Sequence, residues 1–181
     1  MRVIAGEFRS RVLKSLPGLD VRPTPDRLRE TLFDILAARV DSVVFADVYA
    51  GTGAVGIEAL SRGAARAIFV EQNRAAVGVI RDNLKSLKIE SRSVVRNARA
   101  VSALEDIEAD IFFVDPPYPL EKEYARSLDI LGRRAPALTV VQHDKRLDLA
   151  DTYGRIARVR IVKQSDNKLS FYEPRPVTVA P

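Results

Sequence analysis

The chain has 181 residues, 46% of them hydrophobic, and carries a formal net charge of +5. This length and composition fit one compact soluble domain, and no apolar run is long enough to span a bilayer. The first residues lack the apolar core of a secretory signal, so we expect a cytoplasmic protein. The absence of cysteine, together with a single histidine, excludes disulfides, thiolate nucleophiles and cysteine zinc sites, and we expect no metal. The excess of basic over acidic residues favours a polyanionic partner.

Residues 1–21 predict a basic β-hairpin arm. Two cationic runs flank Gly6–Glu7, and the segment ends near a turn at Pro17–Gly18. The cations of this opening stretch are Arg2, Arg9, Arg11, Lys14 and Arg22. From the charge alone, the arm is either an edge ribbon whose charges resist aggregation or a contact for nucleic acid.

Strands and helices alternate through the segment 22–173. Thr24 as N-cap, Pro25 and Asp26 predict the start of an amphipathic helix. After it, strands are expected at 43–48, 68–71, 94–98, 111–114 and 138–142, with helices at 57–62, 73–87, 101–104 and 121–133. This order predicts a Rossmann-like three-layer α/β sandwich around a parallel sheet. Runs at 155–162 and 168–172 predict an antiparallel hairpin at one edge, followed by a proline-rich tail at 174–181.

A glycine-rich turn follows the first strand. Gly51 and Gly53 permit a tight turn, and Gly56 allows close packing of helix on strand. Glu71 ends the next strand, where an acid that binds ribose hydroxyls is expected. The pattern fits a nicotinamide enzyme and an S-adenosylmethionine enzyme equally well, and an ordinary glycine turn is the third possibility.

Further polar residues favour S-adenosylmethionine. Asp47 suits the ligand's ammonium group or the N–H groups of the loop, and it does not suit a pyrophosphate. Asn97 ends the third strand, where its amide oxygen can accept from an adenine amine. Prolines cannot continue a central strand, so the chain must leave the sheet at Asp115, at the edge where ligands bind. A dehydrogenase has no use for this combination, and no histidine is placed to relay its proton.

The stretch Asp115–Tyr118, DPPY, suits a flat base that carries an exocyclic amine. The carboxylate of Asp115 and the carbonyl of Pro116 can both accept from the amine, and the ring of Tyr118 can stack on the base. His143 has no metal-binding or triad partners near it in the sequence, so it is interpreted as structural.

The segments MRVIAG, RPTPDRLRETLF, DVYAGTGAVGIEALSRGA and DPPY occur in this order over nearly the whole chain. They resemble the RsmD-like family of small-subunit (16S) ribosomal RNA guanine-N2 methyltransferases, which are class I S-adenosylmethionine-dependent enzymes. The resemblance implies a methyltransferase domain at 22–173, S-adenosyl-L-methionine as cofactor, and ribosomal RNA or the small subunit as partner. We expect a monomer. One departure is Asn97, where the family usually has an aspartate.

The resemblance and the pattern together assign roles to residues. Asp115, Pro116 and Tyr118 are the predicted catalytic residues, and the arm cations with Arg22 are the predicted RNA contacts. Arg22 and Thr24 are implied to help close the site. The predicted cofactor contacts are Asp47, Tyr49, Ala50, Gly51, Thr52, Gly53, Gly56, Glu71, Gln72, Asn97, Ala98 and Thr24.

Other functions remain open at this point. A DNA methyltransferase acting on adenine N6 or cytosine N4 attacks the same kind of amine, although a chain of this size has no separate domain for reading DNA sequence. Cytosine C5 methylation is disfavoured, because its usual route needs a cysteine adduct. A non-catalytic RNA-binding or ribosome-assembly protein with the same fold is a third class, and the intact DPPY and glycine loop argue against it.

Overall fold

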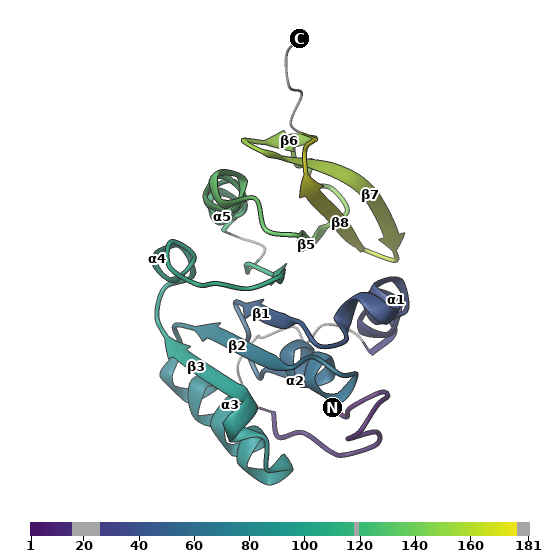
Figure 1. The fold of residues 1–181 in the computed structure, drawn as a ribbon, viewed down its shortest axis with the longest axis vertical. Helices are drawn as coiled ribbons and strands as arrows, with labels where there is room; N and C mark the ends of the chain where they lie inside the picture. Colours follow the sequence, from purple (N-terminus) through teal and green to yellow (C-terminus); the bar gives the residue numbers. More distant parts are fainter. Residues whose placement is uncertain (16–25, 118–119, 177–181) are drawn as a thin grey trace.

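A computed structural model describes residues 1–15, 26–117 and 120–176. An eight-stranded mixed sheet runs through it in the order β3-β2-β1-β4-β5-β8-β7-β6 (Figure 1). The strands β1 to β5 pair in parallel, and β8, β7 and β6 are antiparallel. The strands are β1 (Val44–Val48), β2 (Arg66–Glu71), β3 (Ser93–Asn97), β4 (Ile111–Val114), β5 (Leu138–Asp144), β6 (Thr152–Tyr153), β7 (Ile156–Gln164) and β8 (Asn167–Pro174).

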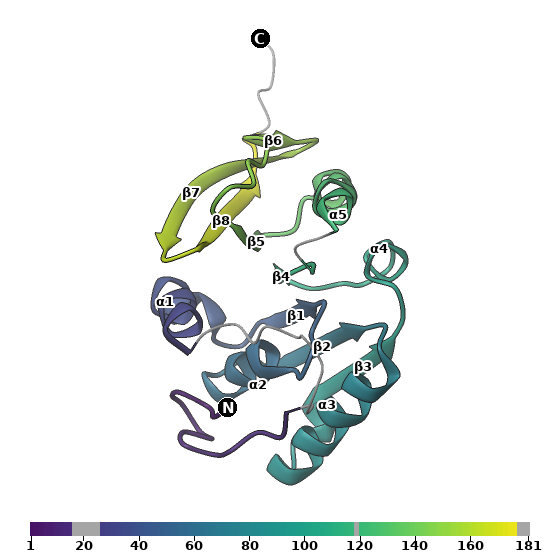
Figure 2. The same cartoon turned by 180° about the vertical axis from the view of Figure 1, so that it is seen from behind.

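Helices cover both faces of this sheet. They are α1 (Asp26–Leu36), α2 (Ala54–Ser61), α3 (Arg74–Leu87), α4 (Ala100–Ala103) and α5 (Glu121–Arg134), with short 3-10 turns η1 (Ala37–Val40) and η2 (Glu90–Arg92). Helices α1 and α2 pack on one face, whereas α4 and α5 pack on the other, as the view from behind also shows (Figure 2). The predicted three-layer sandwich is therefore confirmed. Within the described part of the chain, no helix is long and apolar enough to cross a membrane.

Strand β4 shows why the apolar run before the DPPY stretch is continuous. Phe112 and Val114 pack in the cluster with α4 and α5, whereas Ile111 and Phe113 pack in the cluster with α1 and α2. A strand buried on both faces needs apolar residues at every position. Helix α1 follows the predicted amphipathic pattern, with Leu28, Leu32 and Leu36 buried. Its predicted cap, Thr24 and Pro25, lies outside the described residues.

The N-terminal segment is less regular than the predicted hairpin. Over residues 1–15, one antiparallel bridge, Arg2 to Val12, takes the place of paired strands. Val3, Phe8 and Leu13 are buried against α2 and α3, so the segment is docked on the body instead of standing free (Figure 1). The apolar residues of the segment explain this docking, since burying them removes apolar surface from water. The rest of the predicted arm, 16–21, lies outside the described residues.

A buried carboxylate completes this docking. Glu58 of α2 accepts hydrogen bonds from the backbone N–H groups of Ile4, at 2.8 Å, and Ala5, at 3.0 Å. Arg62 Nε donates to the same carboxylate at 2.8 Å, and Arg29 of α1 donates to the Arg2 carbonyl at 2.6 Å. Buried charges are tolerated when they are paired and hydrogen-bonded in this way. Arg29 therefore has a structural role.

The antiparallel hairpin at the end of the chain is confirmed, and its strands β7 and β8 are longer than predicted. Strand β8 lies between β5 and β7, and the short β6, which the sequence did not indicate, pairs with the start of β7. A register shift between Arg158 and Arg160 interrupts the β7–β8 ladder. Such a bulge twists an exposed edge and hinders pairing with other chains.

We predict that Gly56→Ala lowers the free energy of unfolding by about 1–3 kcal/mol, because overpacking strains a filled core. A Cβ at Gly56 would lie 2.4 Å from Cε1 of the Phe69 ring. The matched control is Gly78→Ala on α3, where a Cβ meets nothing within 4 Å. This control is expected to stabilise the helix by about 0.5–1 kcal/mol. Urea unfolding of both variants checks this, and equal responses would contradict the close-packing role of Gly56.

Candidate active site

The elements that carry the glycine loop, Glu71, Asn97 and Asp115 end at one edge of the sheet. Strands β1 to β4 run parallel, so their carboxyl ends lie together. Val48 pairs with Val114 in β4, and Glu71 pairs with Asn97 in β3. The glycine loop after β1 and the turn at Asp115 therefore start from neighbouring strand ends. This is the edge where ligands bind in open α/β sheets.

The glycine loop folds into a tight turn. Tyr49, Gly51 and Gly53 have φ angles of 65°, 55° and 79°, in the left-handed region. Gly53 N donates to the Ala50 carbonyl at 2.7 Å, which closes the turn. A left-handed tyrosine is strained, and contacts from elsewhere must hold it. The Tyr49 hydroxyl supplies them, lying 2.9 Å from Oε2 of Glu123 and 3.2 Å from the Ser127 hydroxyl.

Carboxylates hold the N–H groups of this loop. Glu71 Oε2 accepts from Gly51 N at 2.9 Å, and Asp47 Oδ2 accepts from Gly56 N at 2.8 Å. A loop that binds a pyrophosphate offers its N–H groups to the anion. Here the same groups face acidic side chains, which would also repel a phosphate. These two acidic side chains disfavour a pyrophosphate at the same N–H groups, which agrees with the expectation from the sequence.

Asp47 is a strongly perturbed acid of the site. Burial raises its pKa to about 7, the Gly56 N–H partly offsets this effect, and the nearby Glu71 raises the pKa further. The sequence suggested two partners for Asp47, the ligand's ammonium group and the N–H groups of the loop. The structure contains the second kind of partner, the Gly56 N–H. A cation bound beside Asp47 would favour its charged form.

Asn97 is oriented by the ends of two strands. Its amide Nδ2 donates to the carbonyls of Glu71 and Gln72, each at 3.0 Å. The side chain is exposed, and with both amide hydrogens engaged its Oδ1 is the atom that can accept from a ligand. The nearby Ala98 N donates to the Glu71 carbonyl at 3.2 Å. This geometry is compatible with the predicted adenine contact.

The turn after β4 is held from behind. Asp115 N donates to the Val48 carbonyl at 3.3 Å, and Asp115 is half-buried. The Pro116 carbonyl, predicted to face the substrate amine, accepts a hydrogen bond from the buried Tyr124 hydroxyl at 2.9 Å. A carbonyl has two lone pairs, so this bond leaves room for a second donor. Tyr118 lies outside the described residues.

Helix α5 contacts both halves of the site. Glu123 binds the Tyr49 hydroxyl from the glycine loop, and the next residue, Tyr124, binds the Pro116 carbonyl. The sequence indicated a helix at 121–133 and gave Tyr124 no role in the site. Its phenol, six residues beyond the DPPY stretch in the sequence, was the available signal, because a buried tyrosine hydroxyl usually finds a partner.

Asn83 of α3 is a second residue that the sequence analysis missed. It is buried, and its Oδ1 accepts from Lys14 N at 2.7 Å. Its Nδ2 donates to the carbonyls of Lys14 and Thr52, each at 3.2 Å. Asn83 thus links the N-terminal segment to the glycine loop. An asparagine on the apolar face of a helix was the signal, since a buried amide needs hydrogen-bond partners.

The predicted RNA contacts that the structure describes are exposed. Lys14 Nζ forms an ion pair with Asp82 at 2.8 Å, and Arg11 donates to the Ser86 carbonyl at 3.4 Å. Arg2 and Arg9 also face solvent. Arg22, like Thr24, lies outside the described residues. The N-terminal segment therefore exposes these cations while its residues Val3, Phe8 and Leu13 are buried.

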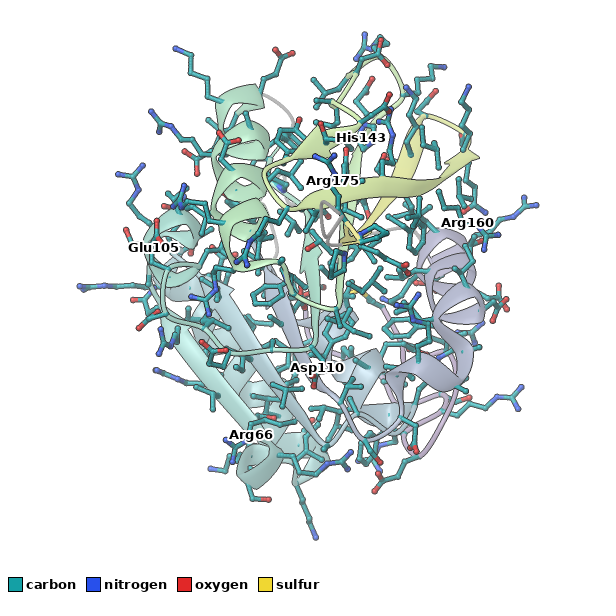
Figure 3. The ribbon with its side chains drawn as sticks, turned by 45° about the horizontal axis from the view of Figure 1, so that its top comes forward. Arg66, Glu105, Asp110, His143, Arg160 and Arg175 are labelled. Carbon is teal, nitrogen blue, oxygen red and sulfur yellow. The ribbon has the colours of Figure 1, made fainter. Side chains whose placement is uncertain are left out.

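His143 lies in β5 instead of beyond the strand, and it is buried. Its Nε2 is 2.9 Å from the Ser170 hydroxyl, and its Nδ1 is 3.1 Å from the Asp144 carbonyl. Figure 3 shows it within the region of the terminal hairpin, whereas Arg160 extends from the outer edge. Among the described residues, no group of three or more His, Cys, Asp or Glu side chains could hold a metal. His143 is therefore a structural residue.

The sheet order, together with the glycine loop and the DPP turn at its carboxyl edge, places the chain among class I methyltransferases. A solved structure, "Putative methyltransferase yhhF from Escherichia coli", is 33% identical and superposes with a TM-score of 0.83, covering 97% of this chain and 98% of that one. The chain belongs to the family described as "Conserved hypothetical protein 95", whose model matches residues 1–173. This match confirms the RsmD-like resemblance.

Two curated relatives carry related names. "Putative rRNA methyltransferase YlbH" of Bacillus subtilis is 32% identical over 184 residues, which cover 97% of this chain and 100% of that protein. "Ribosomal RNA small subunit methyltransferase D" of Escherichia coli is 42% identical over 119 residues, which cover 65% of this chain and 60% of that protein.

We predict that the burial of Asp47 makes the protein less stable as the pH rises. The raised pKa of about 7 means that the folded state holds the proton more tightly than the unfolded state. The contribution of Asp47 to the free energy of unfolding is fully present below about pH 4. It is lost as the pH rises towards 7. Asp47→Asn cannot ionise, so its unfolding free energy, relative to the wild type, should be higher at pH 8 than at pH 5 by about 1–3 kcal/mol. Urea unfolding at both pH values measures this difference, and parallel profiles would contradict it.

Proposed function

We propose that this protein transfers a methyl group from S-adenosyl-L-methionine to the exocyclic N2 amine of a guanine in small-subunit ribosomal RNA. The observation that carries the proposal is the position of Asp115 and the Pro116 carbonyl. Both follow β4 at the strand ends where the carboxylate-lined glycine loop begins. The names of the relatives support ribosomal RNA as the substrate class.

The residues of the loop suit this cofactor. Glu71 keeps lone pairs that can accept from ribose hydroxyls, and Asp47 supplies negative charge near the place of an ammonium group. Asn97 Oδ1 is available to the adenine amine. When bound, the cofactor supplies a methyl group that is electrophilic because its sulfur is positively charged. Thr24 and Arg22 are part of the proposal through the family resemblance alone.

Asp115 and Pro116 supply alignment. The amine of guanine is a weak nucleophile, because its lone pair is delocalised into the ring. Accepting its N–H bonds at the carboxylate and the carbonyl directs that lone pair towards the methyl carbon, and the negative carboxylate stabilises positive charge as it grows on nitrogen. Tyr124 holds the Pro116 carbonyl in place, and Asp115 can accept the released proton. Tyr118 is proposed to stack on a base that has left its helix.

We further propose that the substrate is the ribosomal RNA itself or the assembled small subunit, that the enzyme works as a monomer, and that it acts in the cytoplasm. The exposed cations of the N-terminal segment suit a phosphate backbone. Its backbone is fixed by Glu58 and Asn83, so these cations have a defined position relative to the glycine loop.

A methyl-transfer assay with labelled S-adenosyl-L-methionine tests the proposal. Small ribosomal subunits, free ribosomal RNA and duplex DNA are offered separately, and the products are identified as nucleosides. We expect N2-methylguanosine from ribosomal RNA or subunits. Labelled adenine or cytosine in the DNA would show a DNA amino methyltransferase instead. RNA binding without transfer to any substrate would show a non-catalytic assembly protein.

We predict that Asp115→Ala lowers turnover by about a hundredfold or more, because it removes the acceptor that aligns the amine. Binding of S-adenosylhomocysteine should survive within about threefold, since the loop contacts are unchanged. Asp129→Ala, an exposed position on α5, is the control and should retain wild-type turnover. A near-normal rate for Asp115→Ala would remove this residue from the mechanism.

We predict that replacing Arg9, Arg11 and Lys14 together by alanine weakens RNA binding and makes it less sensitive to salt. Removing one cation that binds a phosphate should reduce the slope of log K against log salt by roughly one. The segment should stay docked, because Asn83 holds the backbone of Lys14 and not its ammonium group. Filter binding between low and moderate salt measures the slope. An unchanged slope would leave the segment with a structural role alone.

A further inference from the structure

A cavity of about 330 Å³ adjoins the proposed catalytic turn, lined by Glu121, Tyr124, Asp144, Arg146 and Leu147. Tyr124 connects the two places, since its hydroxyl donates to the Pro116 carbonyl. Strand β5 lies beside β4 with Val141 opposite Val114, so its end at Asp144 reaches past the level where β4 turns away. The cavity therefore lies at the carboxyl end of the sheet, where the proposed catalytic turn begins.

An acid–base pair lines this cavity. Asp144 Oδ1 accepts from the backbone N and from Nε of Arg146, each at 2.9 Å, and Oδ2 accepts from Nη2 at 3.2 Å. These bonds lower the pKa of Asp144 to about 2, so its carboxylate is ionised at neutral pH. The Arg146 side chain is 84% exposed, which leaves its guanidinium accessible to a ligand.

The pair has hydrogen-bonding capacity beyond these contacts. Each carboxylate oxygen accepts about two hydrogen bonds, so within the described structure Oδ1 is filled and Oδ2 has an acceptor position left. A guanidinium has five N–H donors, and the pair uses Nε and one of those on Nη2. An acceptor and a donor therefore stand side by side.

We propose that Asp144 and Arg146 recognise the Watson–Crick edge of the target guanine. Asp144 accepts from N1–H, and Arg146 donates to O6, while Asp115 accepts from the N2 amine. Together the three groups present acceptor, acceptor and donor, which is the pattern that cytosine offers to guanine in a base pair. This inference rests on the proposed function and adds the residues that select the base.

The same pattern rejects the other bases that carry an amine. Adenine N1 and cytosine N3, which adjoin their amines, are acceptors and would face the Asp144 carboxylate. Two acceptors would then face each other. The base would shield the Asp144 carboxylate from water without offering it a hydrogen-bond donor, and this costs free energy. The pair therefore separates guanine from the targets of adenine N6 and cytosine N4 methyltransferases, although all of these targets have an exocyclic amine.

The first experiment measures kcat/KM on unmodified small ribosomal subunits for Asp144→Asn, Arg146→Ala and Arg146→Lys. Asp144→Asn should lower kcat/KM about 10- to 100-fold, as expected when a charge-assisted hydrogen bond is removed. Arg146→Ala should give a similar loss, and Arg146→Lys should recover part of it. The affinity for S-adenosylhomocysteine should change less than about twofold. Asp166→Asn is the control, because it removes an exposed ion pair with Lys145 on the same loop and lies outside the cavity lining.

A second measurement separates base recognition from a purely structural role of the pair. Guanosine and cytidine 5′-monophosphates are compared as inhibitors competing with RNA. The wild type should prefer the guanine nucleotide by about fivefold or more, and Asp144→Asn should lose the preference.

Distinct outcomes would overturn the inference. One is that Asp144→Asn keeps the wild-type kcat/KM. A second is that this variant loses cofactor affinity and melting temperature in parallel with its activity. A third is that it still prefers the guanine nucleotide. Failure of the proposed function itself would look different, because the wild-type enzyme would then label no guanine in any substrate.

Discussion

Acidic side chains that accept from backbone N–H groups hold the site together. Asp47 accepts from the N–H of Gly56 and Glu71 accepts from that of Gly51, and these bonds hold the turn after β1 in shape. Charge-assisted bonds of this kind are stronger than neutral ones, and buried N–H groups need acceptors. Because the acceptors are carboxylates, the loop also acquires a negative charge that disfavours phosphates. The same contacts therefore shape the loop and disfavour a ligand that carries phosphates at this position.

Single buried polar side chains connect this site to the surrounding helices and to the N-terminal segment. Tyr124 of α5 reaches the catalytic turn, and Asn83 of α3 joins the glycine loop to the N-terminal segment. Glu58 fixes the same segment from α2. Each group is buried among apolar side chains, where an unsatisfied hydrogen bond costs more than at the surface. The proposed RNA contacts, cofactor loop and catalytic turn thus form one connected scaffold.

Much of this arrangement could be predicted from the sequence. Apolar periodicity placed the parallel strands and their helices, because burial on one or both faces leaves a regular pattern. Gly56 was correctly assigned to close packing on a strand, and Phe69 is its contact. The pattern failed where it was short or irregular. Strand β6 has only two residues, and the opening segment has apolar residues without strand periodicity, so a hairpin was predicted where one bridge exists.

The sequence by itself determined the order of the elements and the carboxyl edge on which the motifs meet, because turns and prolines act through neighbours along the chain, and it favoured methyl transfer over the other functions considered. It could not determine which side chains meet across the fold. The partnership of Tyr124 with Pro116 and the cavity beside Asp144 and Arg146 depend on how α5 and β5 lie against β4. Only the tertiary structure decided these contacts, since a hydrogen bond between distant residues requires a geometry that no local pattern encodes.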